Sequence, residues 1–403
     1  MAGLAACGQK AGFEMKIAII GAGIGGLQMA RRLTEHGHEV IVFEKAHGVG
    51  GRMSTRKAEA YAFDHGAQCF TARSKQFSDF LAPYIEMQVV AEWKGKVMNF
   101  ELGKKDMKRI WYEKHLVGSP AMNSLCKVMA EGLNVKLATE VAPIKQNVEG
   151  KHVLQDINGK ELGVFDWVIS SAPPAQTANL IQQFRHIEHV KMHCCFALML
   201  GYARKWDKSW IAAKVRNDVV KWISVNSTKM GRDEGITSIV VHSSNNWSDD
   251  NVETDIELVK QHMLQSFMQL TGIANSPDHI GIHRWKYAIL DDSEIKRPLI
   301  DHELKVAASS DWVITSRIED VWLAAENTVS NILQGRNEVS ENASAAGADS
   351  AASNISEVIE MAWQDEISFE SINKASGYTE KQVIELMRSN LKPSSYKAWR
   401  KRK

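Results

Sequence analysis

The stretch GAGIGG at residues 21–26 limits the fold of this chain more than any other, because of what flanks it. The apolar, branched run KIAII at 16–20 predicts a strand buried on both faces of a parallel sheet. Residues 26–37 have apolar positions at helical spacing and end at a glycine, and HEVIVFE at 38–44 predicts a second buried strand. Strand, glycine turn, helix and strand in this order predict one βαβ unit.

The glycines of this turn suit the binding of a dinucleotide. Gly21, Gly23 and Gly26 let backbone N–H groups approach a pyrophosphate, and the start of the helix supplies partial positive charge. Glu44, at the end of the second strand, is placed to accept hydrogen bonds from adenosine ribose hydroxyls, and the adjacent Lys45 is included in the predicted site. The cofactor is therefore either a nicotinamide dinucleotide that exchanges or a flavin that stays bound.

A second glycine pair favours the flavin. In HGVGGRMSTR at 47–56, Gly50 and Gly51 allow a loop to return to the mouth of the first motif and pass close to the diphosphate. Arg52 follows, and its forked donors can neutralise the diphosphate. Such a grip suits a permanently held cofactor.

With this doublet the sequence resembles the flavin amine oxidase superfamily. Five further segments are similar to segments of bacterial renalases, in the expected order: FDHGAQCFTARS (63–74), LVGSPAMNSL (116–125), CCFALML (194–200), HRWKYA (283–288) and SDWVITSRIEDVWLA (310–324). The resemblance implies an FAD-dependent oxidase that oxidises the 2- and 6-dihydro isomers of NAD(P) by hydride transfer to the flavin and reduces O2 to H2O2. An amine oxidase of the same superfamily is the alternative.

The resemblance also implies a set of catalytic residues beside and opposite the flavin. Because the isoalloxazine itself accepts the electrons, these residues are expected to stack, orient and exclude water. Arg284 is expected to orient its strand or to contact a substrate phosphate. The full set is Gln68, Phe70, Thr71, Arg284, Trp285 and Tyr287.

Four more residues complete the cofactor site that the resemblance implies. Val141 is expected at the adenine side and Asp311 at the ribityl hydroxyls, while Arg317 and Glu319 are expected at the start of the last helix, near the flavin. Asp320 departs from the family, which has a glycine there. A carboxylate would oppose negative charge on the reduced ring unless it turns outward to cap the helix.

These segments predict an α/β protein with a Rossmann-like FAD-binding domain, an inserted α+β substrate domain and a small all-α C-terminal module. The FAD-binding domain is expected at 15–75, 110–175 and 296–335, and the substrate domain at 76–109 and 176–295. Within them, VLQDINGKEL at 153–162 predicts a hairpin, 135–144 paired strands, and about 255–270 an amphipathic helix. Residues 1–14 are expected to be a disordered extension, and 336–354 has linker composition.

The sequence of the C-terminal module, at 355–403, predicts a helix, a turn at Gly377 and a second helix. Ile372, Val383 and Leu386 are expected to form a small core. It resembles a helix-turn-helix and a short bacterial family with the same ending, a resemblance that implies no activity. Residues 391–403 contain six basic residues, two aromatics and no acid. They are either a solvated basic tail or a weak contact for a nucleic-acid backbone.

Charge and cysteine content limit the partners and the compartment. Forty-nine basic and forty-eight acidic residues leave a formal charge of +1, which argues against a chain that binds nucleic acid or a membrane over its whole surface. Five cysteines without CxxC spacing suit a reducing compartment, and no apolar run approaches the roughly 20 residues of a membrane helix. We expect a cytoplasmic protein whose partners are O2 and a small molecule, a dinucleotide or an amine. No metal site is expected, because neighbours in MHCC (192–195) point to opposite faces of a strand.

Overall fold

A computed structural model of the chain describes residues 14–109, 111, 113–146, 149–291, 295, 297–335, 355–363, 367–391 and 393–402. The expected linker at 336–354 and almost all of the expected extension at 1–14 lie outside these ranges. Within the described part of the chain, no helix is both long enough and apolar enough to cross a membrane.

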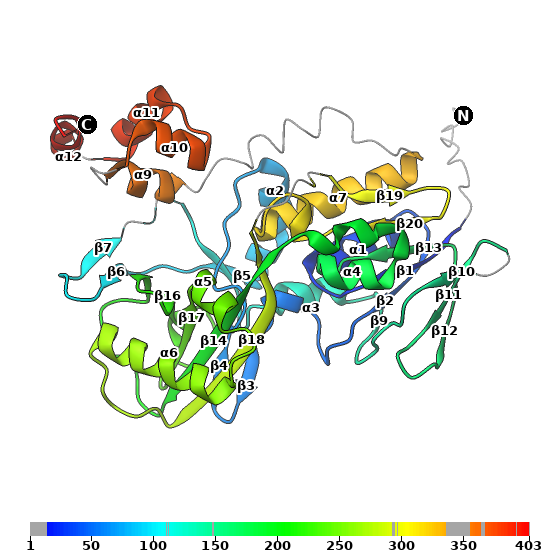
Figure 1. Cartoon of the computed structure of the whole chain (residues 1–403), viewed down its shortest axis with the longest axis horizontal. Helices are drawn as coiled ribbons and strands as arrows, with labels where there is room; N and C mark the ends of the chain where they lie inside the picture. Colours follow the sequence, from blue (N-terminus) through cyan, green and yellow to red (C-terminus); the bar gives the residue numbers. More distant parts are fainter. Residues whose placement is uncertain are drawn as a thin grey trace, which may run out of the picture.

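The predicted βαβ unit is confirmed and contributes two adjacent strands to a six-stranded central sheet (Figure 1). It consists of β1 (Lys16–Ile20), α1 (Ile24–Glu35) and β2 (Glu39–Phe43), with β1 and β2 parallel. The strand order is β19-β20-β13-β1-β2-β9, and only the edge strand β19 runs antiparallel to its neighbour. The other four strands are β9 (Asn134–Lys136), β13 (Trp167–Ser170), β19 (Leu299–Asp301) and β20 (Val306–Ala308).

Both faces of the central sheet are buried, as its apolar strands require. Ile17 and Ile19 of β1 point into one core, while Ala18 and Ile20 point into another. Helices α1, α2 (Lys75–Glu86), α3 (Ser124–Ala130) and α7 (Ile318–Gln334) pack on the first core. The second core is covered by α4 (Pro174–Leu180), the 3-10 segment η2 (Gln182–His189) and a small sheet of β10 (Lys145–Gln146), β11 (His152–Gln155) and β12 (Glu161–Phe165).

In this domain the structure confirms the hairpin predicted from the sequence and contradicts the predicted pairing of two strands. Strands β11 and β12 form the hairpin predicted from Asn158-Gly159, with Gly159 at φ +82°. The pairing expected within 135–144 is wrong, because β9 pairs with β2 and Val141 forms only an isolated bridge to Asp156. Backbone partners far away in sequence replace the local ones.

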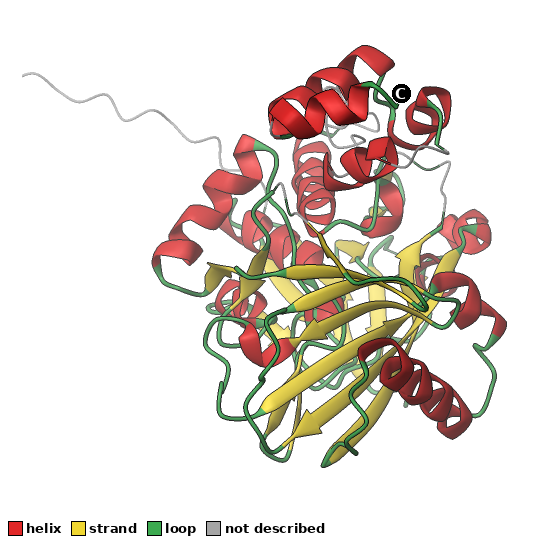
Figure 2. Ribbon diagram, turned by 90° about the vertical axis from the view of Figure 1, so that its left-hand side faces the viewer, coloured by secondary structure: helices red, strands yellow, loops and turns green. Residues whose placement is uncertain are grey.

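A seven-stranded second sheet lies to one side of the central sheet (Figures 1 and 2). Its order is β18-β14-β17-β16-β15-β6-β7. The strands are β6 (Val97–Glu101), β7 (Met107–Arg109), β14 (Met192–Tyr202), β15 (Ala212–Arg216), β16 (Val220–Val225), β17 (Thr237–Ser243) and β18 (His279–Leu290). Segments from both halves expected for the substrate domain therefore meet in one sheet, whereas Phe77 and Leu81 of α2 pack into the core of the central sheet.

Helix α6 (Ile256–Thr271) covers one face of the second sheet, close to the predicted helix at 255–270. The Asp255 side chain caps it by accepting hydrogen bonds from two backbone N–H groups, and Gly272, at φ +67°, ends it. Short elements complete the two domains: α5 (Asn245–Asp250), β3 (Arg56–Ala58), β4 (Tyr61–Phe63), β5 (Val90–Glu92), β8 (Leu116–Gly118), η1 (Gly51–Met53), η3 (Asn226–Thr228) and η4 (Asp311–Val313).

The C-terminal residues form a four-helix unit with a core of its own, coloured orange to red in Figure 1. Its helices are α9 (Ile355–Trp363), α10 (Phe369–Ser376), α11 (Glu380–Asn390) and α12 (Pro393–Arg400). Gly377 turns the chain at φ +73°, and Ile372 and Val383 are fully buried, as predicted. The basic ending is not a simple tail, because it forms α12 and buries Trp399 completely, with its Nε1 donating to the Ala362 carbonyl at 2.7 Å.

Candidate active site

A cavity of about 1410 Å³ lies between the carboxyl ends of strands β1, β2 and β13 of the central sheet and the second sheet. A pocket for one small ligand usually has roughly 300–1,000 Å³, so this one has room for a cofactor and a substrate. The cavity is lined by all the predicted site residues except Gly26 and Glu319: Gly21, Gly23, Glu44, Lys45, Gly50, Gly51, Arg52, Gln68, Phe70, Thr71, Val141, Arg284, Trp285, Tyr287, Asp311 and Arg317.

Gly26 and Gly23 of the first turn are needed for different structural reasons. A Cβ on Gly26 would lie 1.9 Å from the Gly21 carbonyl oxygen, so Gly26 allows the helix to pack on the strand. A Cβ on Gly23 would meet no protein atom within 4 Å, although Gly23 lines the cavity. Gly23 is also the N-cap of α1 and offers no side-chain cap to the first turn of the helix. The turn thus presents open space and a helix N-terminus to the cavity, as an anionic pyrophosphate needs.

Glu44 is held rigidly at one end of this turn. Its two carboxylate oxygens accept hydrogen bonds from the backbone N–H groups of Ala22 and Ala46, both at 2.8 Å. Lys45 and Val141 line the same cavity. A carboxylate oxygen can accept a second hydrogen bond, so Glu44 retains capacity for a ribose hydroxyl.

The second glycine pair returns to the first motif, as expected. The Gly50 N–H donates to the Ala22 carbonyl at 2.9 Å, and the φ angles of Gly50 and Gly51 are +117° and +51°. A Cβ on Gly51 would lie 3.6 Å from the Cα of Gly23. The two glycine motifs therefore form adjacent walls of one cradle.

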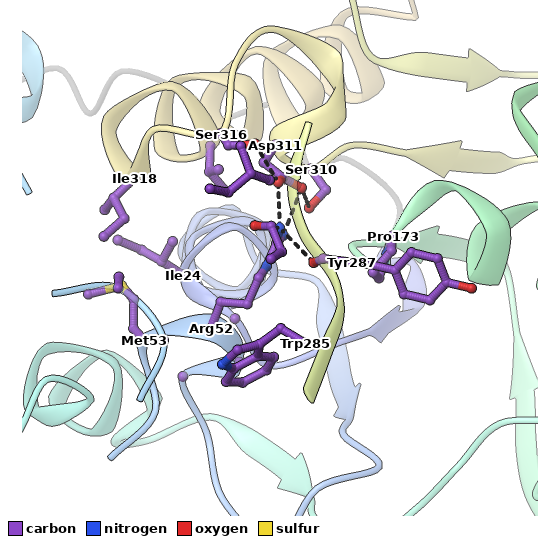
Figure 3. Close-up of a pocket in the computed structure, with 18 of the residues that line it drawn as sticks. Ile24, Arg52, Met53, Pro173, Trp285, Tyr287, Ser310, Asp311, Ser316 and Ile318 are labelled. Atoms are coloured by element: carbon purple, nitrogen blue, oxygen red, sulfur yellow. Dashed lines mark hydrogen bonds and ion pairs between the residues drawn. The ribbon is translucent and has the colours of Figure 1, made fainter. Parts of the chain in front are cut away.

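Arg52 and Asp311 are bound to each other (Figure 3). Nη1 and Nη2 of Arg52 donate to the two carboxylate oxygens of Asp311 at 2.5 and 2.7 Å, and Nη1 also donates to the Ala288 carbonyl of β18 at 3.2 Å. Asp311 is buried and also accepts a hydrogen bond from Ser316 at 3.1 Å. The forked donors expected to face a diphosphate are thus engaged by the residue expected at the ribityl hydroxyls.

Glu319 has a structural role away from the cavity. Its carboxylate accepts hydrogen bonds from the backbone N–H groups of Arg73 and Ser74, just before α2, and from Nη2 of Arg317 at 2.8 Å. Glu319 therefore joins the beginning of α7 to the beginning of α2. Arg317 is the N-cap of α7 and lines the cavity.

Asp320 does not turn outward, which was one of its two expected arrangements. It is 1% exposed, accepts a hydrogen bond from the Thr315 hydroxyl, and leaves Oδ1 buried without a hydrogen-bond partner. Burial raises the pKa of Asp320 and thereby favours the neutral acid. A protonated carboxyl group would not oppose negative charge nearby.

Gln68 is fully engaged by the protein. Its side-chain N–H groups donate to the carbonyls of Asp64 and Gly66, and its oxygen accepts a hydrogen bond from Lys229 at 3.4 Å. It therefore shapes the cavity wall rather than offering an amide donor. Phe70, paired through its backbone with Leu116, continues the same wall.

On the second sheet, Trp285 belongs to a cluster of rings that the sequence does not predict. Trp285 stacks on His65 with ring centroids 5.1 Å apart, and its Nε1 donates to the His65 carbonyl at 2.9 Å. The His283 ring lies 4.4 Å from that of Trp285, and Nε2 of His242 lies 3.1 Å from the His65 carbonyl oxygen. These residues lie up to 220 positions apart, so no local pattern joins them.

Burial keeps these imidazoles neutral at physiological pH. Desolvation lowers the pKa of His65 to about 3 and the pKa values of His242 and His283 to about 4. The neighbouring charge of Arg56 lowers the pKa of His65 and His283 further.

The Arg284 side chain has other contacts than the neighbouring Trp285, although both residues line the cavity. Its Nη2 donates to the Thr254 carbonyl at 3.1 Å, and its guanidinium lies 5.6 Å from the centre of the Phe196 ring. Phe196 belongs to the core beneath α6, on the other face of the sheet. These contacts fit the strand-orienting alternative for Arg284.

The rest of the second-sheet wall is aromatic and basic. Trp222 of β16 belongs to this wall, and beside it the rings of Trp111 and His115, in the segment between β7 and β8, stack with centroids 3.7 Å apart. Basic side chains accompany them: Arg109 of β7, Lys214 of β15 and Lys221 of β16. Among the described residues, the strands of this sheet contribute no carboxylate to the cavity lining. No group of His, Cys, Asp or Glu in the described ranges is arranged to hold a metal ion.

The residues present fit FAD. An ADP group needs open space at a helix N-terminus and an acceptor for its ribose hydroxyls. The cavity offers these through the open space beside Gly23, the start of α1 without a side-chain cap, the fixed carboxylate of Glu44 and the adjacent glycine doublet. The size of the cavity leaves room beyond the ADP group. The doubly wound sheet and the facing sheet, which is antiparallel except for the parallel pair β6 and β15, thus define an FAD-dependent oxidoreductase with a Rossmann-like cofactor domain.

Comparisons with known families agree. Residues 19–84 match the family described as "NAD(P)-binding Rossmann-like domain", and residues 99–290 match "Flavin containing amine oxidoreductase". Both matches agree with a flavin-dependent oxidoreductase that has FAD as its cofactor. Residues 356–403 match "Protein of unknown function (DUF2805)", a description that names no activity for the C-terminal module.

Individual relatives are similar in part. A 4,4'-diapophytoene desaturase of Staphylococcus aureus is 43% identical over 77 residues, which is 17% of this chain and 15% of that enzyme. A putative protoporphyrinogen oxidase from Exiguobacterium sp. 255-15 has a similar fold, with a TM-score of 0.66, 12% identity, and coverage of 80% of this chain and 99% of that one. Putrescine oxidase bound to putrescine also has a similar fold, with a TM-score of 0.62, 13% identity, and coverage of 80% of this chain and 99% of that one. The two solved structures show the shared fold alone.

Proposed function

We propose that this protein is a renalase-like oxidase that oxidises a dihydronicotinamide-type substrate, such as the 2- and 6-dihydro isomers of NAD(P). FAD would supply the two-electron chemistry, accepting a hydride and passing the electrons to O2. Glu44 and the glycine cradle would hold its ADP portion. The substrate would lie against the second sheet.

The observation that carries the proposal is the composition of the second-sheet wall. Arg109, Lys214, Lys221 and Trp222 of this sheet line the cavity, beside Trp111 from the segment that follows β7, and the described part of the sheet contributes no carboxylate. A flat, phosphorylated substrate is attracted by such a wall through stacking and charge. A small ammonium substrate gains no ion pair from it.

The protein's own residues would position the substrate and keep water away. Trp285 is fixed by its stacking on His65 and by its indole hydrogen bond, so it can act as a rigid plate for a planar ring. The neutral imidazoles of His242 and His283 line the same wall. A hydride donor needs no general base, and a wall without charged imidazoles is consistent with that chemistry.

The test is anaerobic mixing of the purified flavoprotein with 2-dihydroNAD(P) or 6-dihydroNAD(P) in a stopped-flow instrument. Rapid loss of the oxidised flavin absorbance, followed by H2O2 release when O2 is admitted, is expected with at least one isomer. No bleaching with either isomer would reject this substrate class.

An amine oxidase of the same superfamily is the second candidate, supported by the match of residues 99–290 to the flavin containing amine oxidoreductases. A panel of primary and secondary amines with a peroxide readout distinguishes the two. Turnover of an amine, together with silence toward the dihydronicotinamides, would favour this candidate.

A flavoprotein that also binds nucleic acid through 391–403 is the third candidate. Lys397 and Arg400 are exposed on α12, but Trp399 is buried and cannot stack on a base. Salt-dependent retention on DNA or RNA that disappears when the chain is cut within 336–354 would favour it. Retention that is unchanged by this cut would remove it.

A further inference from the structure

Two cations share one buried carboxylate behind the cavity wall. Nζ of Lys229 lies 3.0 Å from Oδ2 of Asp64, and Nη2 of Arg232 lies 2.6 Å from the same oxygen. The side chains of Lys229 and Asp64 are 0% exposed, and that of Arg232 is 3% exposed. Burying three charged groups is costly, so their arrangement calls for an explanation.

The cluster has an excess positive charge. The other oxygen of Asp64 accepts hydrogen bonds from the Thr55 hydroxyl at 2.6 Å and the Met122 N–H at 3.1 Å, both from neutral groups. Lys229 and Arg232 each form an ion pair with Asp64, and no second carboxylate pairs with either of them among the described residues. With Asp64 ionised and both basic side chains protonated, the cluster has a net charge of +1.

The excess charge lies directly behind the cavity wall. Lys229 donates to the side-chain oxygen of Gln68, and both Gln68 and the following Cys69 line the cavity. Burial raises the pKa of Cys69 to about 11, and the charge of Lys229 opposes that rise. Burial and the Lys229 charge both lower the pKa of His242, which lines the cavity on the second sheet. The field of Lys229 therefore reaches both sides of the cavity.

The far end of the cofactor belongs at this wall. Glu44 and Val141, which would hold the adenosine, line the same cavity as Arg52 and Trp285. Arg52, Cys69 and Trp285 line the part of the cavity that would hold the flavin ring. A hydride adds two electrons and one proton to the ring, so the neutral oxidised ring becomes an anion.

We propose that Lys229, with Arg232, is a fixed electrostatic support that favours negative charge on the reduced flavin bound against Gln68 and Cys69. Fixed charges in a buried site stabilise developing charge without reorganisation. This inference rests on the FAD site of the proposed function and not on the identity of the substrate. Its test uses chemical reduction, so it can fail independently of the dihydronicotinamide assignment.

A purely structural alternative exists. Asp64 joins three segments, through Thr55, Met122 and the loop that contains Lys229 and Arg232, and can act as a latch between the domains. A latch affects the thermal midpoint of unfolding. It does not determine the flavin midpoint potential.

The experiment measures the two-electron midpoint potential of the FAD-loaded protein by slow enzymatic reduction with a reference dye. Lys229→Met is expected to shift the equilibrium at least tenfold toward the oxidised flavin, which is about 30 mV in midpoint potential. Lys229→Arg keeps the charge and is expected to stay within threefold of the wild type. Exposed Lys205→Met is the matched control for loss of a lysine and is expected to leave the potential unchanged.

A double variant separates charge from contact. Asp64→Asn/Lys229→Met removes both partners of one ion pair and leaves the net charge at +1 through Arg232, so its potential is expected to return to within threefold of the wild type. If Lys229→Met is isolated without flavin, Arg232→Gln takes its place with the same expected shift. A flavin-loaded Lys229→Met or Arg232→Gln protein with the wild-type potential, whatever its stability, would overturn the proposal.

Discussion

The guanidinium of Arg52 grips the carboxylate of Asp311 through two hydrogen bonds of 2.5 and 2.7 Å, across 259 positions of sequence. One residue follows the glycine doublet, and the other precedes the final helix of the domain. A third contact, from Arg52 to the Ala288 carbonyl, joins strand β18 to the pair. The cofactor cradle and the second sheet are thus connected at the centre of the cavity.

Replacing Asp311 should therefore affect cofactor binding as well as stability. Asp311→Asn leaves Arg52 without a counter-charge and is expected to reduce the free energy of unfolding by about 3 kcal/mol, the lower end for a broken buried pair because Arg52 keeps some contact with solvent. FAD affinity is expected to fall at least tenfold, because Arg52 is then no longer held in place. Fluorescence titration of the apoprotein with FAD and urea unfolding measure the two effects. Exposed Asp250→Asn is the control, and an unchanged FAD affinity in Asp311→Asn would contradict the argument.

The two glycines of the first turn should respond in opposite ways to the same substitution. Gly26→Ala places a Cβ 1.9 Å from the Gly21 carbonyl oxygen and is expected to destabilise the apoprotein by about 3 kcal/mol or more. Gly23 has a φ of −73°, which alanine adopts easily, and its Cβ would meet only the cavity. Gly23→Ala should leave the melting temperature of the apoprotein nearly unchanged and weaken FAD binding at least tenfold. A Gly23→Ala protein that binds FAD normally would show that the pyrophosphate lies elsewhere.

Stability should fall as the pH drops below neutrality. His65, His242 and His283 have folded-state pKa values of about 3 to 4, below the ordinary value of 6.5 for a histidine in an unfolded chain. Between these values the unfolded state binds protons that the folded state does not, so each histidine lowers the free energy of unfolding by up to about 1.4 kcal/mol per pH unit of acidification. Urea unfolding between pH 7 and pH 5 measures the slope. His242→Gln should reduce that slope, and an identical slope in variant and wild type would refute the assignment.

The basic wall should contribute to substrate affinity if the substrate has phosphates. Lys214→Met is expected to raise KM for a dihydronicotinamide dinucleotide about tenfold, equivalent to about 1.4 kcal/mol, while kcat changes less than twofold. The corresponding dihydronicotinamide riboside, which lacks phosphate, should show the same KM with both proteins. A loss of kcat with both substrates would indicate damage to the site rather than lost phosphate binding.

The C-terminal module should depend on Trp399. Its side chain is fully buried and donates to the Ala362 carbonyl, so Trp399→Ala is expected to destabilise the module by about 3–5 kcal/mol. Limited proteolysis should then digest the residues after 355 faster, while FAD stays bound to the remainder. Exposed Trp363→Ala is a partial control because its side chain is 36% exposed. Equal protease resistance of Trp399→Ala and wild type would show that this core does not support the module.

Local chemistry made the cofactor side of the cavity predictable. A glycine turn, an acid at the end of a strand and a glycine doublet each carry their reason within a few residues, and the helix at 255–270 has its Asp cap and Gly stop in its own sequence. The same holds for the hairpin at Gly159. In each case the residues that make the structure are neighbours in the chain.

The substrate side depends on contacts between distant segments, which one sequence does not reveal. Trp285 is fixed by His65, 220 positions away, and Lys229 reaches Asp64 across 165 positions. Gln68 illustrates the limit, because its position on the cavity wall followed from the family resemblance, whereas its contact with Lys229, 161 positions away, did not. A buried lysine in a loop also has no sequence signal of its own.

The most direct test of the account is the identity and amount of the flavin in the purified protein. Absorbance of the native protein, followed by release of the cofactor with heat and its separation by chromatography, is expected to give one FAD per chain, released intact because no covalent attachment is expected. Gly23→Ala should contain much less. A colourless protein that takes up no FAD from an excess would contradict the central claim that the cavity beside the first glycine turn is a flavin site.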